Sequence, residues 1–328
     1  MHRIAKQIHN EILNAKKILL VPHQKPDGDA MGSVSAFSHF LRNIGKPHDA
    51  FCLTPITSRL ANLPHLIKIS TDPNIWNTAE YDVVIVLDSG DLNYAGVEAL
   101  AKNLPPRTII INIDHHISNK KFGHHNLVIP TASSTAEVLH FFFRQNNIGI
   151  SKNMALALLT GLITDTENFS NPGTTEHSLK VASELIRHGA NFNLIKNWFL
   201  RDKPMEALKL WGVALSRLAK NEKLDIVYTF ITLEDLKTHN ASETESEGIA
   251  NFLNNINEGR ASLVLKETWD GKIKGSFRTT RDDFDVSLIA STLGGGGHKK
   301  ASGFLIAGEI NEALEKIWAA IEKNNGTV

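Results

Sequence analysis

Two patterns of apolar residues divide the first half of the chain. Ile4, Ile8 and Ile12 lie one helical turn apart, which predicts an amphipathic helix over residues 2–16, and a second helix is expected over about 30–44. Short, continuous apolar runs of the kind that forms strands buried on both faces cover residues 17–21, 83–87 and 108–113. Strands that alternate with helices form a parallel sheet through right-handed crossovers, so the pattern predicts an α/β domain.

The pattern changes in the second half of the chain. A charged amphipathic stretch that contains Pro204 is interpreted as helices that lead into a second domain, where alternating residues from Leu224 onward predict strands. Helical patterns lie at about 134–147, 151–166 and 176–189, and the later strands are expected at 226–231, 260–266 and 272–278. We therefore expect a parallel-sheet α/β domain over 1–190, a helical linker over 191–222 and a smaller α/β domain over 223–328.

Composition and charge narrow the class of protein. The 328 residues are 42% hydrophobic, which suits a globular chain with two cores. Lys and Arg total 35, as do Asp and Glu, and this balance argues against a protein that coats long nucleic acid. The single cysteine is Cys52, the first residues lack the apolar run of a signal peptide, and no apolar stretch reaches the roughly 18–20 residues of a membrane span. We expect a cytoplasmic protein without membrane contact.

Ionisable residues follow the first expected strand. His23, Asp27 and Asp29 lie on a loop that Pro26 stiffens and Gly28 makes compact, so their side chains can converge on one point. The carboxyl ends of parallel strands are also where ligands bind in such sheets. The alternative is an ordinary turn in which Asp29 caps the next helix, and on this motif alone the two interpretations are equal.

The next two expected strands also end in ionisable residues. Asp88 ends one of them, with an N-cap of a helix near Asn93 as the alternative, and Asp114-His115-His116 ends the other. Adjacent histidines point in different directions, so one can bind a metal while the other contacts a substrate.

Two further features are one more candidate ligand and a second histidine pair that serves as a comparison for His115-His116. Asp165 ends an apolar helical stretch, and taken alone it is better explained as a solvated residue at a helix end. His124-His125 is a second histidine pair, but it follows no apolar strand and no acidic residue precedes it. We interpret this pair as surface residues.

Together these residues suffice for two cations. His23 and Asp27 are assigned to one cation, Asp29, His115 and Asp165 to the other, and Asp88 to a bridging position. Two cations held close together can activate a water and neutralise charge on a phosphoryl group. Oxygen and imidazole ligands favour Mn²⁺, with Mg²⁺ or another divalent ion as alternatives, and no thiolate supports a structural zinc site.

The ordered motifs resemble those of the DHH phosphoesterase superfamily, and Gly294-Gly295-Gly296-Gly297-His298 resembles the glycine-rich motif of its DHHA1 domain. The likeness extends from about Ile18 to Leu305. It implies the ligand assignments above, a place for His116 near the scissile phosphate and a supporting role for Asp114. Two departures bear on substrate choice: Glu167-Asn168-Phe169 stands where similar proteins usually have Gly-x-Phe, and Tyr94 lies near the position of a common Arg.

The glycine run is expected to form a loop whose backbone N–H groups bind a phosphate, with Gly295, Gly296, Gly297 and His298 as substrate-binding residues. The weaker alternative is a flexible hinge. Arg278 resembles a substrate-binding position of the family, whereas Arg281 is equally well explained as part of a solvated turn. A substrate is then expected to lie between the two domains.

The resemblance implies hydrolysis of short oligoribonucleotides, of 3′-phosphoadenosine 5′-phosphate, or of both. Other members hydrolyse cyclic or linear dinucleotides, which is the alternative, and a nucleotide-binding regulator with weak catalysis is a candidate of a different class. A pyrophosphatase is disfavoured, because that branch lacks the Gly-Gly-Gly-His motif. We leave open whether the chain acts alone or as a homodimer.

Overall fold

The computed structural model describes residues 1–61, 63, 65–78, 80–200 and 204–324. These residues form two compact units, Met1–Asp202 and Lys203–Val328, which are described separately. None of the helices in the described ranges is long and apolar enough to cross a bilayer.

The first unit is built on a sheet of five parallel strands in the order β2-β1-β3-β4-β5. Its strands are β1 (Ile18–Pro22), β2 (His48–Ala50), β3 (Val83–Leu87), β4 (Ile109–Asp114) and β5 (His125–Val128). Its helices are α1 (His2–Asn14), α2 (Gly28–Asn43), α3 (Ser58–Ala61), α4 (Ile75–Thr78), α5 (Glu98–Ala101), α6 (Thr135–Gln145), α7 (Lys152–Asp165), α8 (Glu176–Arg187) and α9 (Phe192–Leu200). The expected parallel sheet is confirmed.

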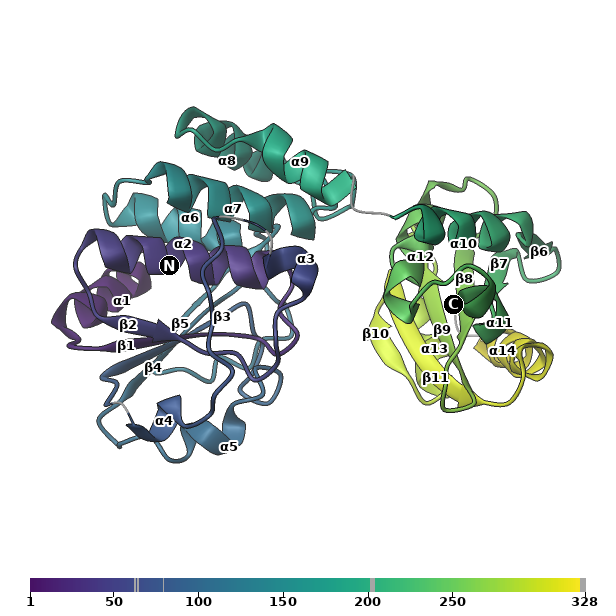
Figure 1. Cartoon of the computed structure of the whole chain (residues 1–328), viewed down its shortest axis with the longest axis horizontal. Helices are drawn as coiled ribbons and strands as arrows, with labels where there is room; N and C mark the ends of the chain where they lie inside the picture. The colour runs from purple at the N-terminus through teal and green to yellow at the C-terminus, as the bar shows by residue number, and fades with distance from the viewer. Residues whose placement is uncertain (62, 64, 79, 201–203, 325–328) are drawn as a thin grey trace. The chain divides into compact units, whose positions relative to one another are not determined.

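Both faces of this sheet are buried, as continuous apolar strands require. Ile18 and Leu20 of β1 pack into the larger core with α2, α6 and α7, which cover one face in Figure 1. Leu19 and Val21 point to the opposite face, where they pack against Trp76 and the segment before α5. The alternation of side chains along an extended strand therefore divides one apolar run between two cores.

The second unit is built on a six-stranded sheet in the order β10-β11-β9-β8-β7-β6, in which only β7 and β8 are parallel among the named pairs. Its strands are β6 (Ala219–Asn221), β7 (Ile226–Ile231), β8 (Ala261–Glu267), β9 (Lys272–Arg278), β10 (Gly296–His298) and β11 (Ala301–Ala307). Its helices are α10 (Met205–Ser216), α11 (Leu233–Thr238), α12 (Ile249–Phe252), α13 (Val286–Thr292) and α14 (Ile310–Asn324), with 3₁₀ turns η1 (Glu243–Ser246) and η2 (Leu253–Asn255).

The expected linker over 191–222 is divided in the structure. Ile195 of α9 is buried in the core of the first unit, whereas Leu210 and Ala214 of α10 are buried in a core of the second unit. The last residues of the segment form the edge strand β6.

The glycine run departs from the expected loop. Gly296–His298 forms the edge strand β10, which pairs with β11. A glycine-rich segment has no side-chain pattern that marks a strand, so the pairing depends on the neighbouring β11.

Candidate functional site

Three neighbouring strands of the first unit present ionisable residues at one edge of the sheet. His23 follows β1, Asp88 follows β3, and His115 and His116 follow β4, and these strands are adjacent in the order β1-β3-β4. Because the strands are parallel, their carboxyl ends meet at the same edge. The predicted strand-end residues are therefore brought together by the sheet itself.

Helices α2 and α7 bring the other predicted acids to this edge. Asp27, not Asp29, is the N-cap of α2, and one of its carboxylate oxygens accepts hydrogen bonds from the backbone N–H groups of Asp29 and Ala30, both at 3.0 Å. The two helices cross so closely that a Cβ on Gly32 of α2 would lie 2.5 Å from the carbonyl oxygen of Ala157 of α7. Glycine at this crossing is therefore required by backbone contact.

Asp29 is held by the N-terminus of α6. Its carboxylate accepts hydrogen bonds from the backbone N–H groups of Thr135 at 2.6 Å and Ala136 at 3.0 Å, and its side chain is buried. The hydroxyl of Thr135 also donates to Asp88 at 2.8 Å. Thr135 was not predicted from the sequence, where only the Ser-Ser-Thr start of a helix marks it. It is a positioning residue for two of the predicted ligands.

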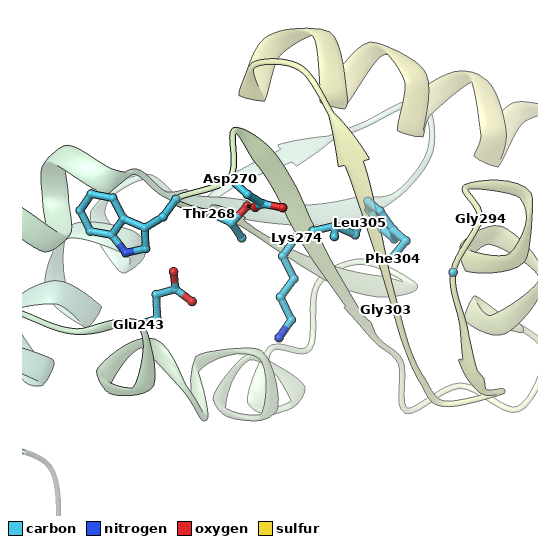
Figure 2. Close-up of a pocket in the computed structure, with 10 residues that line it drawn as sticks. Glu243, Thr268, Asp270, Lys274, Gly294, Gly303, Phe304 and Leu305 are labelled. Carbon is cyan, nitrogen blue, oxygen red and sulfur yellow. Dashed lines mark hydrogen bonds between the residues drawn. The ribbon is translucent and has the colours of Figure 1, made fainter. Parts of the chain in front are cut away.

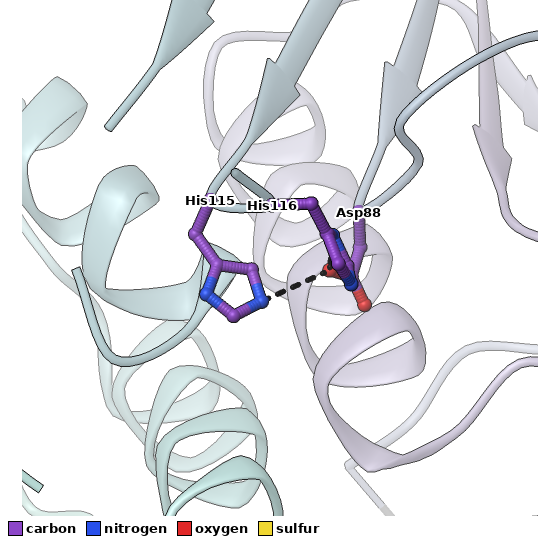
Figure 3. Close-up of side chains that lie close together, drawn as sticks. All are labelled: Asp88, His115 and His116. Carbon is purple, nitrogen blue, oxygen red and sulfur yellow. Dashed lines mark ion pairs between the residues drawn. The ribbon is translucent and has the colours of Figure 1, made fainter. Parts of the chain in front are cut away.

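Asp88 occupies the centre of the cluster and has a left-handed backbone conformation, with φ of 58°. No helix begins near Asn93, where residues 92–96 form turns, so the alternative N-cap role of Asp88 is wrong. One carboxylate oxygen of Asp88 lies 3.7 Å from Nε2 of His23, and the other lies 3.9 Å from Nε2 of His115. A single carboxylate thus faces two imidazoles on different sides. Figure 3 shows Asp88 with His115 and His116 gathered at one place.

Three groups of side chains have ligand atoms within 4.8 Å of one another in the described part of the chain: His23, Asp27 and Asp88; Asp29, His115 and Asp165; and Asp88, His115 and His116. The first two groups reproduce the division of ligands that the sequence predicts. The nitrogen-to-oxygen separations exceed hydrogen-bond length and match the roughly 3–4 Å between ligands of one divalent cation. The donor set therefore fits divalent cations.

The tautomers of His23 and His115 suit metal binding. Nδ1 of His23 lies 2.8 Å from the carbonyl oxygen of Gln24, and Nδ1 of His115 lies 3.2 Å from that of Ala132. A carbonyl only accepts, so each Nδ1 carries the proton and donates. In the neutral rings, Nε2 then has a lone pair that is directed toward the carboxylates.

His116 is held differently. Its Nδ1 donates to Asp114 at 2.7 Å, and the second oxygen of Asp114 accepts from the amide of Asn119 at 2.5 Å. The bond to Asp114 raises the pKa of His116 to about 9, against the effect of burial. Asn119 was not predicted from the sequence, and it fixes the buried Asp114 that in turn orients His116.

The acids of the cluster repel one another. Burial raises the pKa of Asp29 well above its ordinary value, and the charges of Asp88 and Asp165 add to the effect. Burial also raises the pKa of Asp88, and it raises that of Asp165 to about 7 despite the nearby His115. For His23, burial is outweighed by Asp27 and Asp88, and its pKa rises to about 8. Such a group of carboxylates is an incomplete electrostatic arrangement that cations would complete.

The two departures from the family pattern border this cluster. The ring of Tyr94 lies 5.1 Å from the ring of His23 between centroids, and the residue is 48% exposed. Glu167, Asn168 and Phe169 all have positive φ, of 50°, 59° and 62°. Three successive left-handed residues without glycine are uncommon, and they follow Asp165 almost directly.

The second histidine pair lies at the amino ends of the strands, opposite to the carboxyl ends where the cluster lies. His124 and His125 stand at the start of β5, whereas His115 and His116 follow the end of β4. His124 is exposed, and its Nδ1 accepts a hydrogen bond from the backbone of Ile110 at 2.9 Å, while Nε2 of His125 lies 3.6 Å from a carboxylate oxygen of Glu11. The contacts of this pair are structural.

The glycine run of the second unit has two different roles in the backbone. The N–H groups of Gly294 and Gly295 donate to the carbonyls of Ser291 and Ala290 and so terminate α13. A Cβ on Gly295 would lie 2.1 Å from the carbonyl oxygen of Gly303, whereas one on Gly296 would meet nothing within 4 Å. Gly294 and Gly296 are therefore open, whereas Gly295 and Gly297 lie against the backbone of β11, where a Cβ on Gly297 would be 2.6 Å from the carbonyl oxygen of Ala301.

Arg278 and His298 lie on one face of this sheet. Both are in register with Ala301, from β9 and β10 on either side of β11, and directly opposed residues share a face. Nε of Arg278 donates to the side chain of Asn251 at 2.8 Å. Arg281 instead forms two hydrogen bonds with the exposed Asp283, at 2.8 and 2.7 Å, which matches the solvated-turn interpretation.

Comparison with known proteins agrees with this architecture. The DHH family, N-terminal domain, matches residues 17–162, and the DHHA1 domain matches residues 223–323. The chain is 28% identical over 316 residues to the bifunctional oligoribonuclease and PAP phosphatase NrnA of Thermus thermophilus, covering 95% of this chain and 92% of that protein. It is 25% identical over 346 residues to the cyclic-di-AMP phosphodiesterase GdpP of Geobacillus thermodenitrificans, covering 97% of this chain and 49% of that protein. The crystal structure of an exopolyphosphatase-related protein from Bacteroides fragilis superposes with a TM-score of 0.89 at 26% identity, covering 99% of this chain and 97% of that one.

Proposed function

Because the chain belongs to the DHH family and carries a DHHA1 domain, we propose that it is a metal-dependent phosphoesterase. Its proposed substrates are short oligoribonucleotides, 3′-phosphoadenosine 5′-phosphate, or both. The Thermus relative, named for these two activities, supports this choice because it matches nearly the full length of both chains. The balanced charge of the chain is consistent with a short substrate.

The observation that carries the proposal is the position of Asp88. Its two carboxylate oxygens face His23 and His115 respectively, at 3.7 and 3.9 Å. A carboxylate placed in this way is suited to bridge two cations, and this is the arrangement that in-line displacement at phosphorus uses.

His23, Asp27 and Asp88 would hold one cation, and Asp29, His115, Asp165 and Asp88 the other. The oxygen and imidazole donors favour Mn²⁺, with Mg²⁺ as the alternative. When bound, such ions polarise a phosphoryl oxygen and lower the pKa of a coordinated water. Thr135 and the N-terminus of α6 keep Asp29 and Asp88 in place.

His116 is proposed to contact the reacting phosphate. Its Nδ1 is committed to Asp114, so the ring has a fixed orientation and Nε2 is the atom left for a substrate oxygen. A preorganised donor of this kind stabilises charge that develops on the phosphoryl group.

The second unit is proposed to bind the substrate through Gly296, Gly297, Arg278 and His298. Support comes from their common location on β9 and β10 and from the open space at Gly296. Gly295 contributes by permitting the close approach of β11.

A cyclic or linear dinucleotide is the second candidate substrate, favoured by the likeness to the cyclic-di-AMP phosphodiesterase. A nucleotide-binding regulator is disfavoured, because all six predicted metal ligands converge. A reducing, cytoplasmic setting stays a prediction, which the single cysteine Cys52 favours.

The test is a screen of the purified chain with Mn²⁺ against di- to pentaribonucleotides, 3′-phosphoadenosine 5′-phosphate and cyclic dinucleotides, with products identified by mass. We expect metal-dependent release of mononucleotides from the short RNAs or of phosphate from 3′-phosphoadenosine 5′-phosphate. Absence of turnover on every substrate and on a chromogenic phosphodiester, with nucleotide binding retained, would favour the regulator.

A further inference from the structure

The second unit contains a groove that the proposed roles do not use in full. It has a volume of about 710 Å³, within the range of small-molecule sites, and Trp269, Glu243, Lys274 and Gly295 are among its lining residues. Figure 2 shows the side chains of Glu243 and Lys274 beside one open space, with Gly294 further along.

The sheet register explains why this groove is open. Lys274 of β9 is opposite Leu305 of β11, so the two share a face. Over β7 and β8 that face is covered, because Ile231 and Val264 are buried with Leu210 of α10. Over β9 and β11 the cover ends, and Lys274 and Leu305 are exposed.

Trp269 is the most unusual residue of the groove. It lies in the turn between β8 and β9 and is 63% exposed. An indole that is left in water costs free energy, and exposed aromatic side chains are enriched where ligands bind. The ammonium of Lys237 lies 5.9 Å from the ring centroid, so one end of the indole is also in a cationic environment.

The charges of the groove are arranged unevenly. In the described part of the chain, neither Lys274 nor Glu243 has an ion-pair partner, whereas Asp270 is paired with Lys272 at 2.6 Å. A phosphate would be repelled by Glu243 and attracted by Lys274. An uncharged, flat, hydrogen-bonding group suits the end formed by Trp269 and Glu243.

We propose that this groove is a nucleoside monophosphate subsite, in which the nucleobase stacks on Trp269 and the phosphate pairs with Lys274. The proposal rests on the proposed function and adds to it a site that reads the base end of a substrate. Base stacking on an indole is tolerant of sequence, because every base has a π-face. The subsite therefore predicts broad selection of ribonucleotides over compounds that lack a base.

The experiment measures binding by the full chain in a chelator, so that the acidic cluster of the first unit repels phosphate and does not contribute. Adenosine 5′-monophosphate and ribose 5-phosphate serve as probes, with isothermal titration as the readout. Trp269→Ala should weaken binding of the mononucleotide about 10- to 100-fold and change that of ribose 5-phosphate less than about twofold. Trp269→Phe retains a ring and should restore most of the affinity.

Lys274→Gln should weaken both probes by about five- to tenfold, and Lys274→Arg should not. Phe252→Ala is the matched control, because Phe252 is another exposed aromatic residue of the second unit, 47% exposed, that does not line the groove. An equal loss in Phe252→Ala, or unchanged mononucleotide binding in Trp269→Ala, would overturn the proposal. So would unchanged binding accompanied by conversion of a dimer to a monomer, because Trp269 would then cover a second copy of the chain.

These outcomes are separable from failure of the proposed function. Hydrolysis is measured with Mn²⁺, whereas the groove is measured without metal. If mononucleotide binding depends on Trp269 but the protein hydrolyses no substrate, the groove proposal is supported and the phosphoesterase proposal is contradicted. If the protein hydrolyses its substrate but mononucleotide binding does not depend on Trp269, only the groove proposal is contradicted.

Discussion

Three clustered acids of the first unit and two paired acids of the second lie in opposite electrostatic environments. In the first unit, burial raises the pKa values of Asp29, Asp88 and Asp165. In the second unit, Arg281 lowers the pKa of Asp283 to about 2, and two hydrogen bonds from Arg217 lower that of Asp235 against the effect of burial. Among the residues that the structure describes, Asp29, Asp88 and Asp165 lack the arginine partner that Asp283 and Asp235 have in the second unit.

This difference in pKa shifts distinguishes carboxylates that are suited to bind a ligand from carboxylates that stabilise the fold. The ion pair of Arg217 and Asp235 is complete within the chain and also caps α11 through Thr232. The cluster around Asp88 is complete only with something positive added. Each substitution below is made in one unit, and we expect its effect on metal binding, turnover or nucleotide binding to be confined to the site in that unit.

The largest effect is expected at Asp88. Asp88→Asn keeps the side-chain volume and the hydrogen bond from Thr135, but it removes a charge that faces both groups of ligands. Hydrolysis of every substrate should fall by on the order of 10³-fold or more, because water activation and charge neutralisation fail together. The loss is measured as turnover of a dinucleotide and of a chromogenic phosphodiester at saturating Mn²⁺.

Near wild-type turnover in Asp88→Asn would remove the bridging assignment. Mononucleotide binding in chelator is the internal control, because the second unit is unchanged. A loss there as well would mean that the two units are not the independent sites described.

The next effect concerns the two histidines that follow β4. His115→Ala should reduce the metal content to about one ion per chain, because His115 faces Asp29 and Asp165. His116→Ala should retain two ions and lose roughly 10²-fold in turnover, because a group that orients the reacting phosphate is removed. Metal analysis after gel filtration distinguishes the variants, and the reverse pattern would exchange the two roles.

A substitution in the second unit should affect long substrates selectively. A valine at Gly296 projects into open space, so the fold should tolerate it while the approach of a nucleotide is obstructed. Gly296→Val should lower kcat/KM for a dinucleotide about 10- to 100-fold and leave a chromogenic phosphodiester almost unchanged. Steady-state kinetics on both substrates is the measurement.

Gly212→Val is a matched control, because Gly212 also lies in the second unit, on α10, with nothing within 4 Å of a Cβ, and it does not line the groove. Equal losses on the long and short substrates in Gly296→Val would show that the glycine run supports the fold or the metal centre. The division of labour between the units would then be abandoned.

The comparison also predicts a dependence on pH. The pKa values of His23 and His116 are raised to about 8 and about 9 in the folded chain, so the stability that their protons contribute is lost as pH rises through those values, and the raised pKa of Asp165 adds to the loss only up to about pH 7. Without metal, the first unit should lose on the order of 1 kcal/mol per pH unit between pH 6.5 and 8. Asp235 and Asp283 have lowered pKa values, so their contributions are lost only in acid and are constant in this window.

Amide hydrogen exchange in α2 and α7, compared with β8 and β9, measures this prediction within one sample. Mn²⁺ should oppose the decline, because metal binding requires deprotonated ligands and strengthens as pH rises. A metal-free first unit whose protection is flat or rises over this window would contradict the electrostatic account of the cluster.

The strands of the first unit were predictable because burial on both faces leaves a continuous apolar run. β3 covers Val83–Leu87, as predicted, and β1 and β4 differ from the expected bounds by a single residue at each end. β2 and β5 were missed, since His48–Ala50 and His125–Val128 are short and partly polar edge strands. Their formation depends on a neighbouring strand, which local periodicity does not report.

The gathering of the predicted ligand residues was predictable, because strand ends and two helix ends bring them to one place, whereas the residues that support them were not. Thr135 and Asn119 act through hydrogen bonds to residues 47 and 5 positions away, respectively, and no local spacing encodes the longer of these. The glycine run also has a structural role that its sequence signal did not reveal: Gly294 and Gly295 end a helix, and Gly295 admits a strand. Substrate binding by Gly295, Gly296 and Gly297 stays a prediction. Sequence patterns identify residue types at element ends, and the partners come from tertiary structure.

The smallest effect is expected for the second histidine pair. His124 and His125 stand at the amino edge of the same parallel sheet whose carboxyl edge carries His115 and His116, so identical dipeptides are placed at opposite edges. His124→Ala removes only an exposed ring that accepts one backbone hydrogen bond, from Ile110, which water can replace. Turnover and metal content should therefore stay within about twofold of the wild type, and stability should change by less than about 1 kcal/mol. A loss of activity in His124→Ala comparable to that in His115→Ala would show that the edge of the sheet does not decide which histidines act.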